Sequence, residues 1–155
     1  ILYNLKHLLH ADLKDKKGTP LSISFVYGHP NNAKRDEVWI ELRNIRNLVH
    51  KRWVYIGDFN QILSQEDKFG FSHRKIEGAE VFRQTLFDLG LCDLNAKGQH
   101  FTWMNGHRDE SFVMERLDRA FATVDLIISN PHYALRNLPI LRSDHGPIIL
   151  DFEFQ

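Results

Sequence analysis

Cysteine is nearly absent from this chain of 155 residues, which contains only Cys92. A single cysteine excludes an intrachain disulfide and is compatible with a reducing compartment. The apolar neighbours Leu91 and Leu94 predict a small buried side chain at this position rather than a nucleophile. Long apolar runs are absent as well, since none approaches the ~20 residues of a membrane-spanning helix, and no signal-peptide pattern opens the chain.

An excess of charge of one sign is also missing, because 20 Lys and Arg balance 20 Asp and Glu. The chain therefore lacks the basic surplus that lets a protein hold nucleic acid by charge alone. Local basic patches stay open, with candidates at Lys51-Arg52 and His73-Arg74-Lys75, although solvated surface charge is the simpler explanation of each. The length suits one domain with a real core.

Hydrophobic periodicity predicts strands and helices in an order typical of an α/β sandwich. Helices are expected over 34–50 and 77–89, with Gly90 at a C-cap, and a short helix over 123–128 is expected to be capped by Thr123. The expected strands, with a hairpin turn at Asn105-Gly106, cover 21–27, 53–57, 91–94, 100–104, 112–122, 133–141 and 148–154. The late strands are expected to pair antiparallel.

Three short polar segments carry the chemistry of the chain. They read Gly-Asp-Phe-Asn at 57–60, Arg-Leu-Asp-Arg at 116–119 and Ser-Asp-His at 143–145. The first follows an apolar strand and the last precedes one. Carboxylates, a carboxamide and an imidazole at strand ends are the groups that metal-assisted attack on a phosphate ester requires. The segments lie far apart in sequence, so only a fold that gathers strand ends, as many α/β folds do, could unite them.

This ordered set resembles the endonuclease/exonuclease/phosphatase family, whose members are metal-dependent phosphodiesterases and phosphatases. It is most similar to the apurinic-type endonuclease domain of plant LINE-type (non-LTR) retrotransposon polyproteins. Further shared features are Val26-Tyr27-Gly28, Arg35 with Trp39, and the segments 101–103 and 115–120. The likeness runs from about Leu21 to the C-terminus. It implies a partial four-layer α/β sandwich, in which two mixed, largely antiparallel sheets pack together and are flanked by helices.

The beginning of the chain departs from the family pattern. In the family, the first strands carry an Asn and then a metal-binding Glu, and nothing before Leu21 has those patterns. We therefore expect residues 1–155 to form a single domain that corresponds to the C-terminal two-thirds or so of the full domain, with its first strands missing through truncation or decay. Because the metal-binding Glu is absent, we expect the isolated chain to be weakly active or inactive.

The resemblance implies roles for five catalytic residues. Asp58 would orient or deprotonate the attacking water, and Asn60 would hold a phosphate oxygen. His145 would stabilise the developing pentacovalent oxygens or act as an acid, while Asp118 would fix its tautomer and keep it charged. Tyr27 would point its hydroxyl at the scissile phosphate.

The resemblance also implies contacts with metal and substrate. Asp144 would be the metal ligand, directly or through water, for Mg²⁺ or Mn²⁺. Substrate binding would involve Asn60, Arg35, Thr102 and Trp103, the last two bordering a groove for the substrate backbone or an extruded base. Core or cross-strand packing explains the aromatic and threonine positions at least as well. The remaining histidines lack the spacing of a zinc site.

Simpler structural explanations stay open for the other positions. Asp58 and Asn60 can form a turn after a strand, and their alternate spacing brings the two side chains to one side only if the strand geometry continues. Tyr27 can pack against the core at a strand end. The segment 143–147 can be a polar loop that enters a strand.

The expected function is metal-dependent hydrolysis of a phosphodiester, with DNA as the substrate. By resemblance, the nick would prime reverse transcription in a retroelement, with a reverse transcriptase domain in the same polypeptide and the nucleus as the place of action. A catalytically inactive remnant or a nucleic-acid-binding fragment is one alternative. A phosphatase of the same fold is another, although no inserted loop with basic residues near the active site, as expected of such relatives, is seen.

Overall fold

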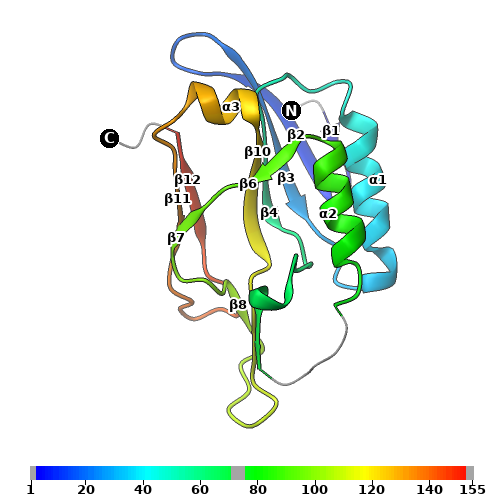
Figure 1. The fold of residues 1–155 in the computed structure, drawn as a ribbon, viewed down its shortest axis with the longest axis vertical. Helices are drawn as coiled ribbons and strands as arrows, with labels where there is room; N and C mark the ends of the chain where they lie inside the picture. The colour runs from blue at the N-terminus through cyan, green and yellow to red at the C-terminus, as the bar shows by residue number, and fades with distance from the viewer. Residues whose placement is uncertain (1–2, 71–75, 153–155) are drawn as a thin grey trace.

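A six-stranded sheet forms the centre of the molecule (Figure 1). It is seen in a computed structural model that describes residues 3–70 and 76–152. Neighbouring strands in this sheet pair antiparallel except for β3 and β4, which pair in parallel. The strands, in spatial order, are β1 (Tyr3–Asn4), β2 (Leu8–Lys14), β3 (Pro20–Tyr27), β4 (Trp53–Asp58), β10 (Asp118–Thr123) and β6 (Leu91–Asp93).

Two helices cover one face of this sheet, and both were expected (Figure 1). Helix α1 spans Arg35–Ile45 after a 3-10 turn, η1 (Asn32–Lys34), and helix α2 spans Ala79–Asp88. Gly90 follows α2 with a φ of 66°, the left-handed conformation of a helix C-cap. The core between helices and sheet is aromatic, and its closest ring pair, Trp39 and Phe82, has centroids 4.4 Å apart.

A second, three-stranded sheet packs on the other face, with the order β12-β11-β7. Its strands are β7 (Ala96–Gly98), β11 (Ala134–Asn137) and β12 (Ile148–Asp151). Side chains alternate along β4, so that Val54 belongs to the core under this second sheet whereas Trp53 and Tyr55 belong to the core under the helices. The prediction of packed, mixed sheets is thereby confirmed. Of the predicted four layers, the described residues form three, since they place no helix on the outer face of the second sheet.

A small antiparallel sheet that was not expected as a separate unit lies beyond the ends of β4 and β10. It consists of β5 (Lys68–Gly70), β8 (Trp103–Met104) and β9 (Val113–Glu115), with the 3-10 turn η2 (Gln65–Asp67) before β5. The segment 112–122, expected as one strand, is therefore two, β9 and β10, in different sheets. The chain bends between them at Arg116 and Leu117, where the Leu117 carbonyl accepts the backbone N–H of Phe59 at 2.9 Å.

Adjacent residues on β10 point to opposite faces of the central sheet. Asp118 lies on one face, and Arg119, only 2% exposed, lies on the other. The Arg119 guanidinium donates to Asp93 at 2.6 Å and forms an ion pair with Asp67. This ion cluster, in which Arg119 and Asp67 are buried and Asp93 is exposed, joins β10 to β6 and to η2. Burial is the largest cause that raises the pKa of Asp93, and the charge of Arg119 opposes it.

Other local expectations need correction. Residues 3–14, for which the sequence predicts no element, contain β1 and the whole of β2. Thr123 precedes α3 (Val124–Ser129), but its hydroxyl donates to the Lys51 carbonyl at 2.6 Å and therefore joins β10 to the start of β4 instead of capping the helix. Cys92 is exposed because β6 is an edge strand of the central sheet. None of the helices in the described ranges is both long and apolar enough to span a membrane.

Candidate active site

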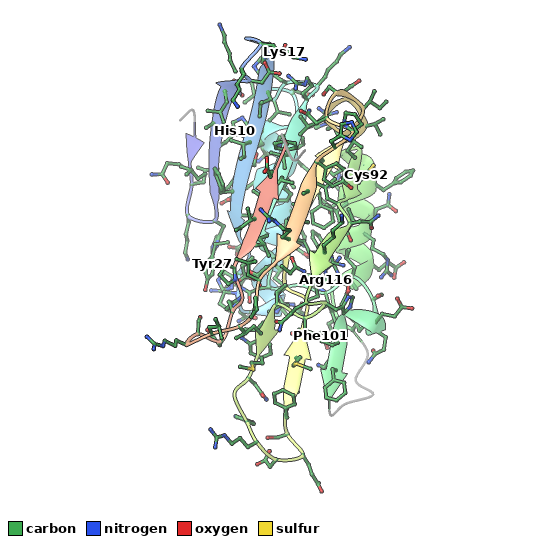
Figure 2. All side chains as sticks on the ribbon, turned by 90° about the vertical axis from the view of Figure 1, so that its left-hand side faces the viewer. His10, Lys17, Tyr27, Cys92, Phe101 and Arg116 are labelled. Carbon is green, nitrogen blue, oxygen red and sulfur yellow. The ribbon has the colours of Figure 1, made fainter. Side chains whose placement is uncertain are left out.

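Strand pairing places three of the predicted residues in one row at an end of the central sheet. Tyr27, the last residue of β3, lies opposite Asp58, the last residue of β4, and Asp58 lies opposite Asp118, the first residue of β10. Adjacent strands are about 4.8 Å apart, so their side chains can act on one ligand. The Tyr27 side chain is 56% exposed at this edge, which Figure 2 shows at the opposite end of the β2–β3 hairpin from Lys17.

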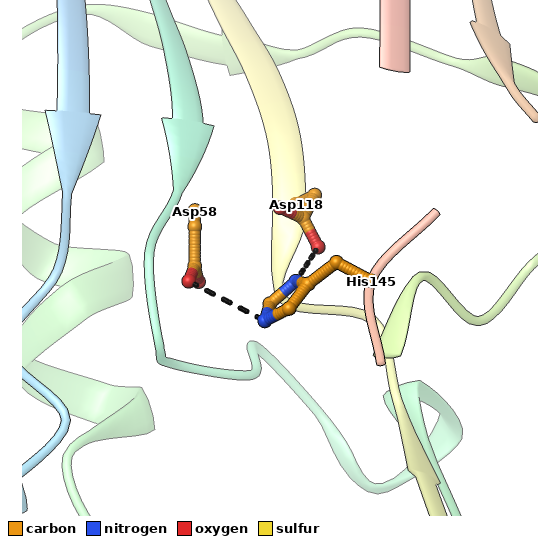
Figure 3. A group of neighbouring side chains, drawn as sticks. All are labelled: Asp58, Asp118 and His145. Carbon is orange, nitrogen blue, oxygen red and sulfur yellow. Dashed lines mark hydrogen bonds and ion pairs between the residues drawn. The ribbon is translucent and has the colours of Figure 1, made fainter. Parts of the chain in front are cut away.

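His145 enters this row from the loop before β12 and lies between the two carboxylates (Figure 3). Its Nδ1 donates to Asp118 Oδ2 at 2.9 Å, and its Nε2 lies 3.8 Å from Asp58 Oδ2. The first is a hydrogen bond, and the second is an ion-pair distance too long for one. The structure therefore brings Asp58, Asp118 and His145 together, and we call them the acid–base trio.

Thr102 supports this trio from behind. Its hydroxyl donates to Asp118 Oδ2 at 2.7 Å and accepts the backbone N–H groups of Leu117 and Asp118 at 3.1 and 3.0 Å. Thr102 is 1% exposed, so it lies behind Asp118 and does not face solvent. Asp118 Oδ2 thus accepts from both Thr102 and His145, which holds the carboxylate and the imidazole in one orientation. The predicted contact of Thr102 with substrate stays a prediction.

Burial changes the acidity of Asp58. It is the largest cause that raises the pKa of this carboxyl, to about 6, and the neighbouring charge of Asp118 raises it further. The backbone N–H of Asn60, which donates to Asp58 Oδ1 at 2.8 Å, and the charge of His145 oppose the increase. A carboxyl that titrates near pH 6 is a stronger base than an ordinary aspartate and is still mostly ionised at pH 7.

The imidazole of His145 is shifted toward its charged form. The hydrogen bond to Asp118 is the largest cause that raises its pKa, burial opposes this, and the charges of Asp118 and Asp58 raise it further. The Nδ1–H bond to Asp118 also fixes the tautomer, so the proton gained on charging is carried by Nε2, the nitrogen that faces Asp58. His145 is thus arranged as a donor at Nε2.

Asn60 is held beside the trio by an unusual backbone. The strand geometry does not continue past Asp58, because Asn60 has a φ of 48° and its side-chain amide donates to the Gly28 carbonyl at 2.7 Å. Gly28 approaches so closely that a Cβ there would lie 2.0 Å from the Phe59 carbonyl oxygen, so only glycine fits. Phe59 is itself fully buried in the aromatic core. The loop that presents Asp58 and Asn60 is therefore anchored on both sides.

Arg35, a predicted substrate-binding residue, is bonded mainly to the protein. Its guanidinium donates to the carbonyls of His29 and Pro30 and to the side chains of Asn32 and Gln61, all at 3.0–3.1 Å. Arg35 nevertheless lines, together with Asn60, an open cavity of about 560 Å³ beside the site. Two of the predicted substrate-binding residues therefore share one cavity.

Trp103 and Asp144 lie on the side of the site that is formed by β8 and the loop before β12. Trp103 in β8 forms an isolated bridge with His145, and the Met104 N–H donates to the Asp144 carbonyl at 3.0 Å. The Asp144 side chain is exposed and stands outside the trio. Its own backbone N–H is the largest cause that lowers the pKa of this carboxyl, and the charge of His145 and the Trp103 indole lower it further.

The basic patch proposed at Lys51-Arg52 does not form part of this site. Arg52 lies at the start of β4, away from Asp58, and its guanidinium donates to Asp15 and Ser129 at 3.0 Å each. The patch at 73–75 lies outside the described residues. The close approach of Gly28 to the Phe59 carbonyl was not predicted from the sequence. The glycine that follows Val26-Tyr27 was the signal that could have indicated it.

The trio also has the geometry of a cation site. One ligand atom from each of Asp58, Asp118 and His145 lies within 4.8 Å of the others, and this is the group among the described residues that could hold a metal ion. Mg²⁺ prefers oxygen ligands and keeps several waters, whereas an imidazole suits transition metals better. Asp144 offers an exposed, ionised carboxylate next to the trio, which fits a water-rich Mg²⁺ site.

No family model and no curated protein sequence matches this chain, but solved structures do. The endonuclease domain of TRAS1, a telomere-specific non-LTR retrotransposon, is similar with a TM-score of 0.73 and 18% identity, over 96% of this chain and 64% of that chain. The 3′-5′ exonuclease NExo from Neisseria meningitidis is similar with a TM-score of 0.65 and 21% identity, over 86% of this chain and 62% of that chain.

A further structure, of TDP2 from D. rerio complexed with a single-stranded DNA product, is similar with a TM-score of 0.52 and 19% identity, over 91% of this chain and 59% of that chain. This chain thus spans less than two thirds of the length of the structures it matches. At these identities the likeness concerns the fold, which is that of endonuclease/exonuclease/phosphatase proteins.

Proposed function

We propose that this chain hydrolyses phosphodiester bonds in DNA. One observation carries the proposal: the His145 imidazole is held 2.9 Å from one carboxylate and 3.8 Å from another, whose pKa is raised to about 6, at the open end of a sheet. General acid–base catalysis uses a protonated acid and an ionised base that face the same point, and His145 and Asp58 are placed in this way. The fold shared with nucleases supports the choice of substrate.

In this proposal Asp58 orients the attacking water and accepts its proton at Oδ2. His145, charged through its bond to Asp118, donates from Nε2 to the phosphate oxygens as negative charge develops on them. Tyr27 and Asn60 orient the phosphate from the neighbouring strand end and loop. All of these groups lie at the same strand ends of the central sheet, so a phosphate that approaches those strand ends meets all of them.

Mg²⁺ or Mn²⁺ is the proposed cofactor, and Asp144 is the residue that would hold it. The cation would supply charge stabilisation to the phosphate oxygens when bound. Because the Asp144 carboxylate is exposed and a single carboxylate holds a divalent cation poorly, we expect weak metal binding and slow turnover.

We further propose that the bond is cut as a nick within DNA for a retroelement of the plant LINE type, in the nucleus and together with a reverse transcriptase. The likeness to the TRAS1 endonuclease domain over 96% of this chain supports this direction. A phosphatase is the nearest alternative, and one structure of NExo as a 3′ phosphatase bound to a product DNA hairpin is also similar, with a TM-score of 0.64.

The test is a single-turnover assay with the protein in excess over a supercoiled plasmid, in Mg²⁺, in Mn²⁺ and in EDTA. We expect metal-dependent conversion to the nicked circle, lost in Asp58→Asn and retained in the matched variant Asp109→Asn in the exposed hairpin. Release of phosphate from a 3′-phosphorylated oligonucleotide without nicking would favour the phosphatase. Binding of DNA with neither reaction would favour the inactive remnant, and nicking that survives Asp58→Asn would contradict the proposal.

A further inference from the structure

Two histidines meet beside Tyr27, at the same end of the sheet as the acid–base trio. The ring centroids of His7 and His29 lie 5.2 Å apart, with the planes at 49°. His7 precedes β2 and exchanges two hydrogen bonds with Tyr27: the Tyr27 N–H donates to the His7 carbonyl at 3.0 Å, and His7 Nδ1 donates to the Tyr27 carbonyl at 2.9 Å. His29 lies in the loop that follows β3. The pair therefore adjoins the row of Tyr27, Asp58 and Asp118.

The hydrogen bonds of the two rings determine which nitrogen carries a proton. His7 Nδ1 must donate, because its partner is a carbonyl, and in the neutral ring Nε2 is then unprotonated. His7 is 6% exposed, and its Nε2 has no hydrogen-bond partner in the part of the chain that the structure describes. His29 Nδ1 accepts the backbone N–H of Asn31 at 3.0 Å, so its Nε2 carries the proton and is a donor.

Positive charge gathers around this pair although the whole chain is neutral. Lys6 and Lys34 are exposed on the segments that carry the two histidines. Burial is the largest cause that lowers the pKa of His29, and the charges of His7, Lys34 and Lys6 lower it further, while Glu37 opposes them. Near neutral pH His29 is thus a neutral N–H donor that feels the charge of two ammonium groups.

We propose that His29, Lys34 and Lys6, with His7 beneath them, form a subsite for a phosphate of the nucleic-acid backbone that flanks the bond to be cut. Phosphate oxygens are commonly held by lysines and by neutral N–H donors, which this group provides. His7 lies two strand spacings from β4, with β3 between them. It is therefore about 10 Å from Asp58. That separation suits a neighbouring phosphate on the same strand rather than the scissile one.

The buried Nε2 of His7 fits this role. Bound nucleic acid would cover the ring pair and supply a partner for this nitrogen. Without an anion, the same nitrogen is a buried acceptor that nothing in the described residues satisfies.

The subsite rests on the proposed function for its place beside a cleaved bond, but its test measures binding alone. We would follow the anisotropy of a fluorescent 12-nucleotide single-stranded DNA in EDTA at several salt concentrations. Loss of one phosphate contact in Lys34→Gln should reduce the slope of log K against log salt by about 0.7. The matched variant Lys51→Gln changes an exposed lysine at the far end of β4 and should leave the slope unchanged.

A second variant tests the neutral donor. His29→Leu should weaken binding about tenfold at constant salt, because it removes a hydrogen bond to a charged group. If this variant folds poorly, the ring nitrogens of His7 and His29 can be followed by NMR in the unchanged protein. Addition of the oligonucleotide should then shift the nitrogen resonances of both rings.

Equal slopes for Lys34→Gln and Lys51→Gln, unchanged ring nitrogens, or absence of DNA binding would each overturn the subsite. Failure of the plasmid assay with the predicted change in slope would instead leave the subsite standing and remove the proposed hydrolysis. The two proposals can therefore fail separately.

Discussion

Two imidazole–carboxylate pairs lie on the central sheet, and they differ in almost every physical property. His10 in β2 lies 3.4 Å from Asp12 and has its Nδ1 2.7 Å from Ser24 Oγ, whereas His145 is bonded to Asp118 at the other end of the sheet. Figure 2 labels His10 in the upper part of the molecule, well separated from Tyr27. His10 is fully buried, and the His145 side chain is 32% exposed.

The pKa values of the two imidazoles are shifted in opposite directions. Burial is the largest cause that lowers the pKa of His10, with Asp12 opposing it, while the hydrogen bond to Asp118 raises the pKa of His145. A Ser, a His and an Asp together resemble a hydrolytic triad, but the Ser24 hydroxyl is fully buried and accepts the Trp53 indole N–H at 2.9 Å. Residue types alone therefore do not identify a site. Access for substrate does.

The largest effect should come from Asp58. Replacing it by Asn removes the base, so nicking should fall by about 10²–10⁴-fold, the usual contribution of a general base. In the unchanged protein the rate should rise as the pH passes about 6, where this carboxyl ionises. The rising limb of the pH–rate profile is the measurement, and a His10→Gln protein that nicks normally is the control. An Asp58→Asn rate within a fewfold of the unchanged protein would refute the assignment.

Asp118→Asn should make the two imidazoles more alike in pKa. Loss of the carboxylate removes the largest cause of the raised pKa of His145, so an NMR titration should show that pKa falling. Activity requires the charged imidazole and is lost as the pH rises through its pKa. The falling limb of the rate profile should therefore move to lower pH in the variant. An unchanged His145 titration would show that the bond to Asp118 does not control this ring.

Thr102→Val should have a smaller effect on the same ring. The variant keeps the shape of the side chain but leaves the backbone N–H groups of Leu117 and Asp118 without their acceptor. We expect about tenfold slower nicking, because the variant loses the hydrogen bond, worth ~1.5–3 kcal/mol, that orients the Asp118 carboxylate. Thr102→Ser, which restores the hydroxyl, should recover most of the rate. If the falling limb of the pH–rate profile shifts in Thr102→Val and not in Thr102→Ser, the hydroxyl positions His145 and does not merely stabilise the fold.

The smallest effect on turnover should follow from His10→Gln, where stability changes instead. The folded pKa of His10 is below its ordinary value of 6.5, so the unfolded chain binds the extra proton first as the pH falls. The contribution of His10 is therefore present above pH 6.5 and lost as the pH falls through its folded pKa. Urea unfolding at pH 7.5 and pH 5 should show a smaller difference in the variant. Equal differences would mean that His10 does not titrate on unfolding.

Much of the site could be predicted from the sequence because its residues follow strong strand signals. The apolar run before Asp58 and the run after His145 are typical of buried strands. The trio follows from the pairing of β4 with β10 and from the bond of His145 to Asp118. Asn60 could not be placed in this way. Its orientation depends on a positive φ and on the close approach of Gly28, which are tertiary features that alternation along a strand does not report.

The break between β9 and β10 was missed for a related reason. The segment 112–122 has no Gly or Pro, so nothing local predicts a bend at Arg116. The bend is stabilised by a group far away in sequence, because the Arg116 N–H donates to the Asp67 carbonyl at 2.8 Å. Likewise, no pattern distinguishes the partners of Thr102 from ordinary cross-strand packing, because its hydroxyl bonds to residues 15 and 16 positions away.

The opposite orientation of Asp118 and Arg119 on β10 makes the site sensitive to the length of the chain as well as to its composition. Inserting or deleting one residue near the start of β10 would exchange the two side chains between the faces of the sheet. A guanidinium would then meet His145, and a carboxylate would enter the cavity left among Asp67 and Asp93. Single-residue length variants should therefore be tolerated in the exposed hairpin at 106–111 and excluded between Leu117 and Ala122, even where every substitution there is conservative.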